Sequence, residues 1–221
     1  EAANFGMFIG SYENMRRVSM RIREAAMELG VKRIVFGECG HAWRVAYSFL
    51  NTLTGVGHGG DDPFAEEFQK QLDPNFPVPQ HICEFTWNEI QKGTLNLDPS
   101  ENDDMVLTFH DSCNVARGSR MGDKAGGQFE IPRNVIKAVC NNYVDMSPET
   151  TREATFCCGG GGGLLTDDLM ELRVKGAMPR MQALDEVIKE QGVTHMAAIC
   201  AICKSQFTKV LPYYGMDMDQ I

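Results

Sequence analysis

Two adjacent cysteines followed by five glycines stand in the stretch that reads FCCGGGGGLL, from Phe156 to Leu165. Adjacent side chains cannot both point into one apolar core, and a glycine run loses more backbone entropy on ordering than any other run of its length. One interpretation is a flexible loop beside two buried cysteines, because an isolated cysteine usually behaves as a small apolar side chain. The other is a metal-cluster loop, in which thiolates are ligands and glycines let backbone N–H groups approach an inorganic anion.

The remaining cysteines are spaced around this pair. There are eight in all, at positions 39, 83, 113, 140, 157, 158, 200 and 203. Between Cys113 and Cys157 lie 43 residues, and 41 residues separate Cys158 from Cys200, which opens a CxxC with Cys203. The chain is too large and too rich in apolar residues (43%) to need disulfides, so such clustering indicates metal or redox chemistry.

Several thiol chemistries compete for this pattern. A zinc site needs four ligands, usually from two close pairs; here the CxxC is one good pair, but adjacent cysteines chelate poorly and the fifth is surplus. The ferredoxin run C-x2-C-x2-C-x3-C-P is absent, and a thioredoxin-like CxxC would leave Cys113 and the CC pair unexplained. Soft thiolates in this number favour iron–sulfur chemistry, in which nearby N–H donors tune the cluster potential.

The amino-acid composition argues against several other classes of protein. The net charge is −9 and no basic block is present, which argues against nucleic acid or an anionic membrane surface as the main partner. No apolar run approaches the roughly 20 residues that cross a bilayer, so no direct membrane span is expected. The first residue is Glu1 rather than Met, and we expect the sequence to be a piece of a longer protein.

Apolar periodicity predicts strands that alternate with helices, which indicates an α/β architecture with short parallel strands and flanking helices. Helices are expected over 15–29, 42–50, 81–91, 132–144, 166–174 and 179–190, and strands over 5–9, 33–36, 105–109 and around 197–199. The segment 55–79 is expected to be a long connection. Loops after the carboxyl ends of parallel strands gather in one crevice, which would bring the distant cysteines together.

The sequence contains a degenerate internal repeat. Residues 30–41 align without gaps on residues 192–203, each reading as glycine cap, strand and ligand-rich loop. In this register Glu38 faces Cys200 and His41 faces Cys203. We therefore predict two pseudo-repeated halves, 1–98 without a full cysteine set and 99–221 with the metal site, whose loops converge on one iron–sulfur centre.

The cysteine pattern resembles a known family. A His-Asp-x-Cys element at Cys113, a CCG and a closing CxxC are typical of the cysteine-rich CCG domain of heterodisulfide reductases and of relatives such as the glycolate oxidase iron–sulfur subunit. Four cysteine-containing sequence segments are most similar to the K subunit of the membrane complex associated with dissimilatory sulfite reductase. They read FGECGHAW, TFHDSCNVARG, FCCGGGGGLLTDD and MAAICAICKSQF. The resemblance covers nearly the whole chain, as two CCG-type halves of which the second keeps its cysteines.

This resemblance implies a [4Fe–4S]-type cluster, which in heterodisulfide reductase is an unusual non-cubane one. The implied ligands are Cys113, Cys157, Cys158, Cys200 and Cys203, with the backbone of Gly159, Gly160 and Gly161 close to the cluster. Ferredoxin-type clusters are expected upstream.

The implied function is that of a catalytic iron–sulfur subunit in a heterodisulfide reductase-like complex at the membrane. It would reduce or form a disulfide or trisulfide on a small sulfur-carrier protein in dissimilatory sulfur metabolism. Electrons would come from a quinol-oxidising cytochrome subunit, with the chain peripheral on the cytoplasmic face. The alternatives are an electron-transfer subunit that only relays, a subunit of a 2-hydroxyacid (glycolate or lactate) oxidase, and a zinc-stabilised structural module.

Other residues have two interpretations each. Cys39 is a core residue or an active-site thiol or additional ligand, and His110 and Asp111 either orient the loop before Cys113 or relay protons to a leaving thiolate. Cys83 and Cys140 lie on apolar helix faces and are expected in the core, whereas His81 is expected at the surface.

Overall fold

The computed structural model describes residues 11–49, 77–121, 124–125, 128–162 and 165–216. The chain divides into two compact units, one made of residues 1–85 and 114–127 and the other of residues 86–113 and 128–221. The expected strand over 5–9 and most of the expected connection over 55–79 lie outside the described residues. No helix within the described ranges is long and apolar enough to cross a membrane.

The first unit is built around a short parallel strand pair. Its elements are α2 (Tyr12–Glu28), β1 (Val35–Phe36), α3 (Gly40–Phe49), β2 (Gln80–His81), β4 (Arg120–Met121) and β5 (Lys124–Ala125). β1 pairs in parallel with β2, whereas β4 and β5 pair in antiparallel orientation. His81, expected at the surface, is fully buried, with its ring edge-on to Trp43 at 5.2 Å between centroids. Helix α5 (Ile82–Gln91) begins in this unit and ends in the second.

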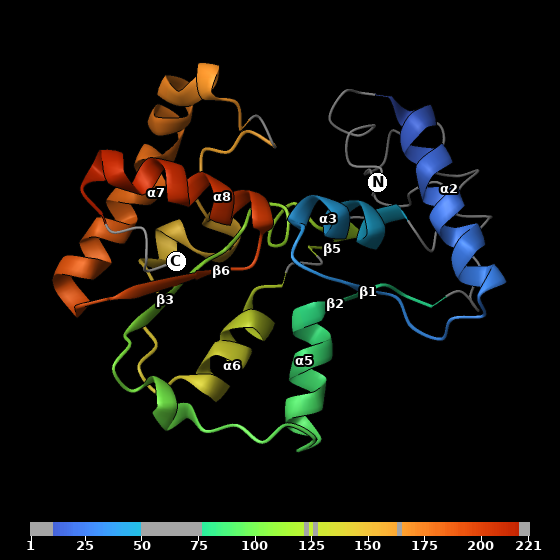
Figure 1. Cartoon of the computed structure of the whole chain (residues 1–221), viewed down its shortest axis with the longest axis horizontal. Coiled ribbons are helices and arrows are strands. Elements are labelled where there is room, and N and C mark those ends of the chain that lie inside the picture. Colours follow the sequence, from blue (N-terminus) through green and yellow to red (C-terminus); the bar gives the residue numbers. More distant parts are fainter. Residues whose placement is uncertain (1–10, 50–76, 122–123, 126–127, 163–164, 217–221) are drawn as a thin grey trace. The chain divides into compact units, whose positions relative to one another are not determined.

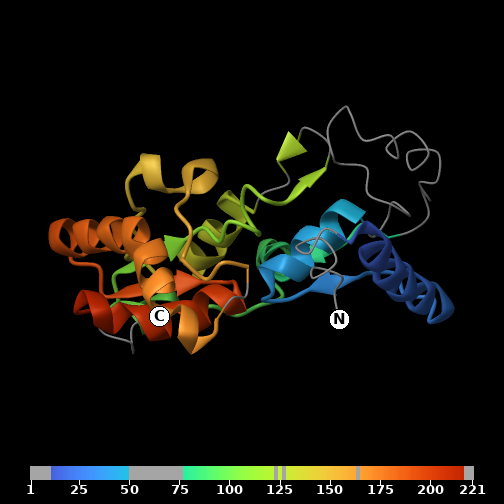
Figure 2. The same ribbon diagram turned by 90° about the horizontal axis from the view of Figure 1, so that it is seen from above.

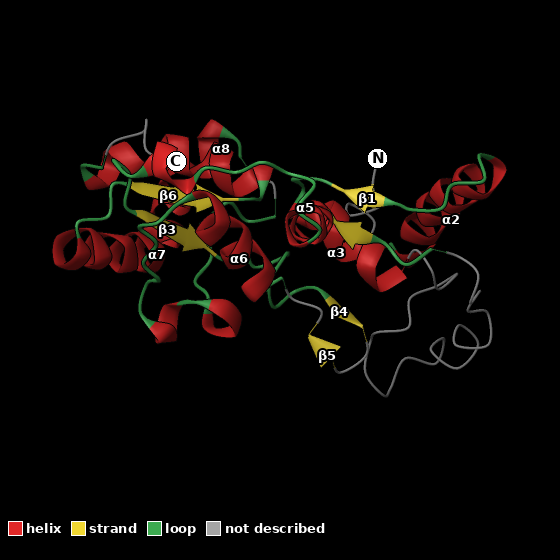
Figure 3. Cartoon of the chain, turned by 90° about the horizontal axis from the view of Figure 1, so that it is seen from below, coloured by secondary structure: helices red, strands yellow, loops and turns green. Residues whose placement is uncertain are grey.

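The second unit carries the other parallel pair. Its main elements are β3 (Leu107–His110), α6 (Glu130–Val139), α7 (Met170–Gln191), β6 (His195–Ala198) and α8 (Ala201–Val210). The same unit also contains short 3-10 helices at Pro99–Asn102, Pro148–Thr150, Arg152–Ala154, Asp167–Leu169 and Leu211–Tyr214. β3 pairs with β6 from Leu107↔His195 to His110↔Ala198, so both strands end at the same edge. Helices α8 and α6 lie on opposite sides of this strand pair (Figures 1 and 3).

The expected α/β architecture with parallel strands is confirmed. The order helix, glycine with positive φ, strand, loop, helix occurs in α2–β1–α3 and again in α7–β6–α8, with φ +62° at Gly30 and +67° at Gly192. The wider pseudo-repeat and the division into halves at 98/99 stay predictions.

Three helix predictions were wrong in their bounds. The helix expected over 132–144 runs from Glu130 to Val139, because Cys140 is extended and Tyr143 bridges Leu107 in parallel. The helices expected over 166–174 and 179–190 form one helix, α7, with Pro179 inside it. A proline removes one helix hydrogen bond, but α7 buries one face along its whole length, from Arg173 to Val187, and this packing keeps it continuous.

The core of the second unit joins α7, β6 and α8. Met181 and Leu184 on α7, Met196 on β6 and Phe207 on α8 are buried in one cluster, which also contains Cys158, Cys200 and Cys203. Helix α7, orange in Figure 2, packs against α8, red. Cys158, Cys200 and Cys203 therefore lie within the hydrophobic core of this unit.

A buried ion pair fixes the end of β3. The guanidinium of Arg133 on α6 donates to both carboxylate oxygens of Asp111, at 2.8 and 2.7 Å, and neither side chain is exposed. The backbone N–H of Arg152 donates to the same carboxylate at 2.8 Å, and the hydroxyl of Thr155 donates to the carbonyl of Asp111 at 2.8 Å. Asp111 thus links β3, α6 and the segment that leads to the two adjacent cysteines.

Gly159 brings this loop into direct contact with α7. Its φ is +84°, a conformation that favours glycine, and a Cβ there would lie 2.6 Å from both the amide nitrogen of Ala177 and the carbonyl oxygen of Arg173. On the helix side, a Cβ at Gly176 would lie 3.5 Å from the Cα of Gly159. The first glycine of the run is therefore required for close approach to a helix backbone.

We expect Arg133→Met to lower the free energy of unfolding by about 3–5 kcal/mol, because it leaves the Asp111 carboxylate buried without its partner. The measurement is urea unfolding followed by circular dichroism. The control is Lys189→Met, which removes an exposed pair with Asp185 and should change stability by about 1 kcal/mol or less. Equal effects of the two substitutions would contradict a stabilising role for the buried pair.

We expect Gly159→Ala to destabilise the chain more than Gly192→Ala does. Both glycines have positive φ, which alone costs about 1–2 kcal/mol for alanine. Nothing lies within 4 Å of a Cβ at Gly192, whereas at Gly159 the backbone of α7 must move, which adds roughly 1–3 kcal/mol. The same unfolding experiment compares them, and equal losses would show that the close approach is not needed.

Candidate metal centre

Five thiols meet at the carboxyl edge of the β3–β6 pair. Cys113 lies three residues after β3, Cys200 two residues after β6, and Cys203 in the first turn of α8. Cys157 and Cys158 come from the loop that Asp111 and Gly159 position. The expectation that strand ends would gather these segments is met, because His110 and Ala198 are paired neighbours at the same edge.

The thiols form a continuous series of contacts. Cys113 hydrogen-bonds with Cys157, Cys157 with Cys158, Cys158 with Cys203, and Cys203 with Cys200. Cys203 also donates to the hydroxyl of Ser112 at 3.7 Å between Sγ and Oγ. The five sulfurs come from three stretches that lie far apart in the sequence, and all eight cysteines of the chain are thiols.

Hydrogen bonds between these thiols shift their pKa values in opposite directions. The sulfur of Cys157 accepts hydrogen bonds from the thiols of Cys113 and Cys158, which lowers the pKa of Cys157. The same contacts with Cys157, followed by burial, raise the pKa of Cys113. Contact with Cys157 also raises the pKa of Cys158. Thiols that share protons in this way are ready to exchange them for a metal cation, since metal binding deprotonates its ligands.

Glycine backbone groups face the adjacent pair. The N–H of Gly159 donates to the Sγ of Cys157 at 3.4 Å, and the N–H of Gly160 donates to Cys158. Gly161 is exposed, with φ +52°, and lines a cavity of about 250 Å³ together with Cys157, Leu172 and others. Backbone donors of this kind stabilise thiolate charge, as the glycine run predicts.

His110 faces the thiols from the end of β3. It is fully buried, and one ring nitrogen and the sulfurs of Cys158 and Cys203 all lie within 4.8 Å of one another. Neither ring nitrogen has a hydrogen-bond partner among the described residues, and the ring is edge-on to Phe207 at 4.9 Å. Burial, and then the positive charge of Arg180, hold the pKa of His110 well below its usual range, so the imidazole is neutral.

Asp111 and Cys39 have different surroundings. The contacts of Asp111 with Arg133 and with the loop backbone are those of a residue that orients the loop. Cys39 lies in the first unit, whereas the five thiols lie in the second. It is half-buried before α3, and the N–H of Ala42 donates to its Sγ at 3.4 Å. A hydrogen bond with His41 is the main cause that lowers the pKa of Cys39.

The two remaining cysteines are core residues, as expected: Cys83 and Cys140 are both buried. Sequence reasoning missed Arg133 and Arg180, which are also fully buried. The available signal was the position of Arg180 within the apolar face of a helix, between Ala177 and Leu184.

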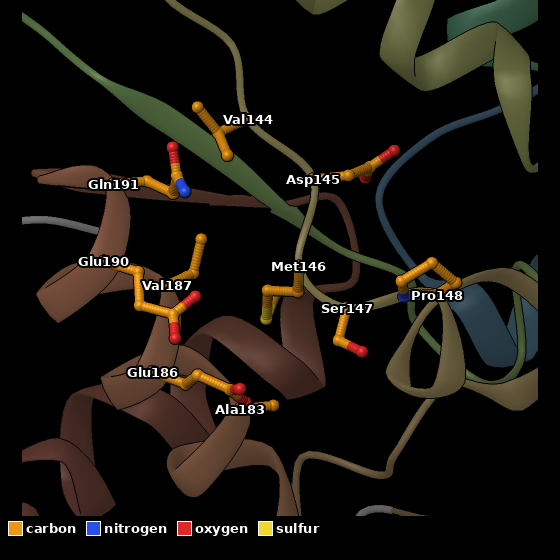
Figure 4. Close-up of a pocket in the computed structure, with 10 residues that line it drawn as sticks. All are labelled: Val144, Asp145, Met146, Ser147, Pro148, Ala183, Glu186, Val187, Glu190 and Gln191. Atoms are coloured by element: carbon orange, nitrogen blue, oxygen red, sulfur yellow. The ribbon is translucent and has the colours of Figure 1, made fainter.

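A second cavity is lined partly by Met146. It has a volume of about 210 Å³ and lies between residues 144–148 and α7. Figure 4 shows its apolar floor of Val144, Met146 and Val187 beside the carboxylates of Glu186 and Glu190. None of the described residues that line it is a cysteine, so this cavity is separate in its chemistry from the five-thiol site.

Comparison with known protein families also singles out the segment that contains the five thiols. A family model described as a cysteine-rich domain, CCG, matches residues 107–208, which contain all five thiols of the site. No solved structure matches the chain significantly.

The chain is also similar to curated proteins. It is 40% identical over 99% of its length to an Hdr-like menaquinol oxidoreductase iron-sulfur subunit of Archaeoglobus profundus, and 37% identical over 99% to subunit 2 of the same kind in Archaeoglobus fulgidus. It spans 40% of the length of each of these relatives. An EtfAB:quinone oxidoreductase of Syntrophomonas wolfei subsp. wolfei is 33% identical over 40% of the chain and 11% of that protein. Residues 107–208 therefore form a CCG cysteine-rich domain, and along nearly all of its length the chain is similar to Hdr-like menaquinol oxidoreductase iron-sulfur subunits.

Proposed function

We propose that Cys113, Cys157, Cys158, Cys200 and Cys203 hold an iron–sulfur cluster of the [4Fe–4S] type, and that the chain serves as the catalytic iron–sulfur part of an Hdr-like oxidoreductase complex. The observation that carries this proposal is the meeting of five thiols at one strand edge. The names of the two relatives that match nearly the whole chain support it.

The residues present fit such a cluster by their chemistry. Five soft donors exceed the four of a structural zinc site, and soft thiolates select iron–sulfur clusters among common metal groups. Two glycine N–H groups already donate to the sulfurs of the adjacent pair. One ring nitrogen of buried His110 lies within 4.8 Å of the sulfurs of Cys158 and Cys203, and such outer groups tune a bound cluster.

The proposed reaction is reductive cleavage of a sulfur–sulfur bond. A disulfide takes up two electrons and two protons, its S–S bond breaks, and two thiols form; oxidation is the reverse. A cluster held by the five cysteines would supply these electrons one at a time. Neutral His110 can donate its ring N–H as a hydrogen bond to the sulfur that becomes a thiolate, and Asp111 orients the segment between His110 and Cys113.

The proposed partners follow from the same reaction. The substrate is a disulfide or trisulfide on a small sulfur-carrier protein, as in dissimilatory sulfur metabolism. Electrons arrive from a quinol-oxidising membrane cytochrome through further clusters, with the chain held peripherally at the cytoplasmic face. The two relatives that match nearly the whole chain are named menaquinol oxidoreductase subunits, which supports a quinol as the electron source.

A second candidate is an electron-transfer subunit whose cluster only relays. The third relative favours it, because that protein is named an EtfAB:quinone oxidoreductase. A substrate-mimicking disulfide separates the two functions: it should perturb the EPR signal of the oxidised cluster if the site is catalytic. An unchanged signal at saturating disulfide would favour the relay, which includes the 2-hydroxyacid oxidase alternative.

We expect single alanine substitutions at Cys157 or Cys158 to abolish cluster retention, because each removes a ligand. The measurement is iron and acid-labile sulfide content after anaerobic purification. Cys140→Ala is the matched control, since that thiol is equally buried but donates only to backbone carbonyls, such as that of Asn142 at 3.6 Å. Zinc without sulfide in the unsubstituted chain, or equal loss of iron in Cys140→Ala, would contradict the proposal.

We further propose that Cys39 is a nucleophilic thiol for substrate sulfur. A lowered pKa keeps Cys39 partly thiolate below the usual thiol pKa of about 8.5. Its alkylation by iodoacetamide should therefore fall less steeply between pH 8.5 and pH 7 than that of a thiol whose pKa is not lowered, measured by mass spectrometry of the labelled peptide. Cys83 is the internal control, because burial raises its pKa to about 11 and its rate should fall about tenfold per pH unit. A tenfold fall per unit at Cys39 would exclude this role.

A further inference from the structure

Arg180 is a fully buried cation whose contacts are all uncharged. Its guanidinium donates to the hydroxyl of Thr155 at 2.9 Å and to the carbonyl of Thr150, and it touches the sulfur of Met146 at 2.8 Å. It also lies over the ring of Phe156, 5.9 Å from the ring centroid. Across the part of the chain that the structure describes, no carboxylate lies within ion-pair distance of it, and its Nε has no acceptor.

Such burial is costly unless a negative charge compensates it. An unpaired buried ion costs several kcal/mol even after relaxation. Arg133 in the same unit shows the usual solution, because two carboxylates, those of Asp111 and Asp145, contact its guanidinium. Arg180 has no equivalent, and burial lowers its pKa to about 10, which still leaves it protonated at neutral pH.

The groups that act on Arg180 electrostatically are Asp111 first, and then Cys203, Cys158 and Cys157. The Asp111 carboxylate contacts Arg133 and not Arg180, so it is shared between two buried cations. Arg180 also bonds directly to Thr155, two residues before the adjacent cysteine pair. Once deprotonated as metal ligands, the three cysteines would supply the further negative charge that Arg180 lacks.

We infer that Arg180 is the internal counter-cation of the five-thiol centre, a positioning residue on α7 whose charge stabilises the anionic centre and raises the midpoint potential of a bound cluster. The inference rests on the proposed function and adds a residue that sets the electrostatics of its site. Reduction adds negative charge to a cluster, so a fixed buried cation favours the reduced form.

The test is an EPR-monitored redox titration of the anaerobically purified chain. Arg180→Gln keeps hydrogen-bond donors near Thr155 and removes the charge, so the midpoint potential should become more negative. Arg180→Lys keeps the charge and should restore most of the difference. A potential in Arg180→Gln that equals that of the unsubstituted chain would overturn the inference.

Two controls separate charge at this position from other effects. Lys175→Met removes a charge from the same helix, but from an exposed side chain paired with Glu171, and should shift the potential much less. Thr155→Val removes the hydroxyl that Arg180 contacts and leaves the charge in place. A shift in Thr155→Val as large as that in Arg180→Gln would show that loop geometry, and not charge, sets the potential, and the inference would then be wrong.

A second readout does not require the cluster. Co²⁺ added to the metal-free, reduced chain reports thiolate binding through its sulfur-to-metal charge-transfer absorption. Loss of an outer group typically lowers metal affinity about 10- to 100-fold, and we expect this of Arg180→Gln but not of Lys175→Met. No Co²⁺ binding and no iron in the unsubstituted chain would defeat the proposed function itself. Binding of equal strength in both variants would defeat only the role of Arg180.

Discussion

The arrangement of the thiols depends on one buried carboxylate, that of Asp111. It stands directly after β3 and bonds to Arg133 from α6 and to the backbone of Arg152, while its carbonyl accepts from Thr155. These contacts bring the segment before Cys113 and the segment before Cys157 to one place. Because a buried charge is tolerated only with its partner in position, the pair allows few alternative arrangements of these loops.

Helix α7 is the second constraint on the site. It continues through Pro179, and its face from Arg173 to Leu184 meets the glycine run at one end and the core at the other. The glycines therefore have two physical tasks. Gly159 lets the loop reach a helix backbone, and the N–H groups of Gly159 and Gly160 point at sulfur. The same helix carries Arg180, so one element provides both the shape and the positive charge at the five-thiol centre.

The five thiols that meet and the strand pair that gathers them could be predicted from residue types and spacing. The thiols of Cys113, the CC pair and the CxxC are visible in the sequence, and the rule that parallel strands end at one edge brings them together. Arg133 and Arg180 could not be predicted in this way, because a charged residue on a helix is usually at the surface and its burial depends on partners far away in the sequence. The continuity of α7 was missed for a related reason, since Pro179 ends most helices and only tertiary packing keeps this one intact. His81 was misplaced because its burial depends on contact with Trp43.

The proposed chemistry requires that the five thiols bind a cluster with several irons rather than a single ion. X-ray absorption at the iron and zinc edges of the anaerobically purified chain tests this claim most directly. We predict an iron edge with scattering from sulfur and, in addition, short-range scattering between irons, which requires a cluster. A zinc edge with sulfur neighbours only, or iron without an iron–iron contribution, would contradict the account.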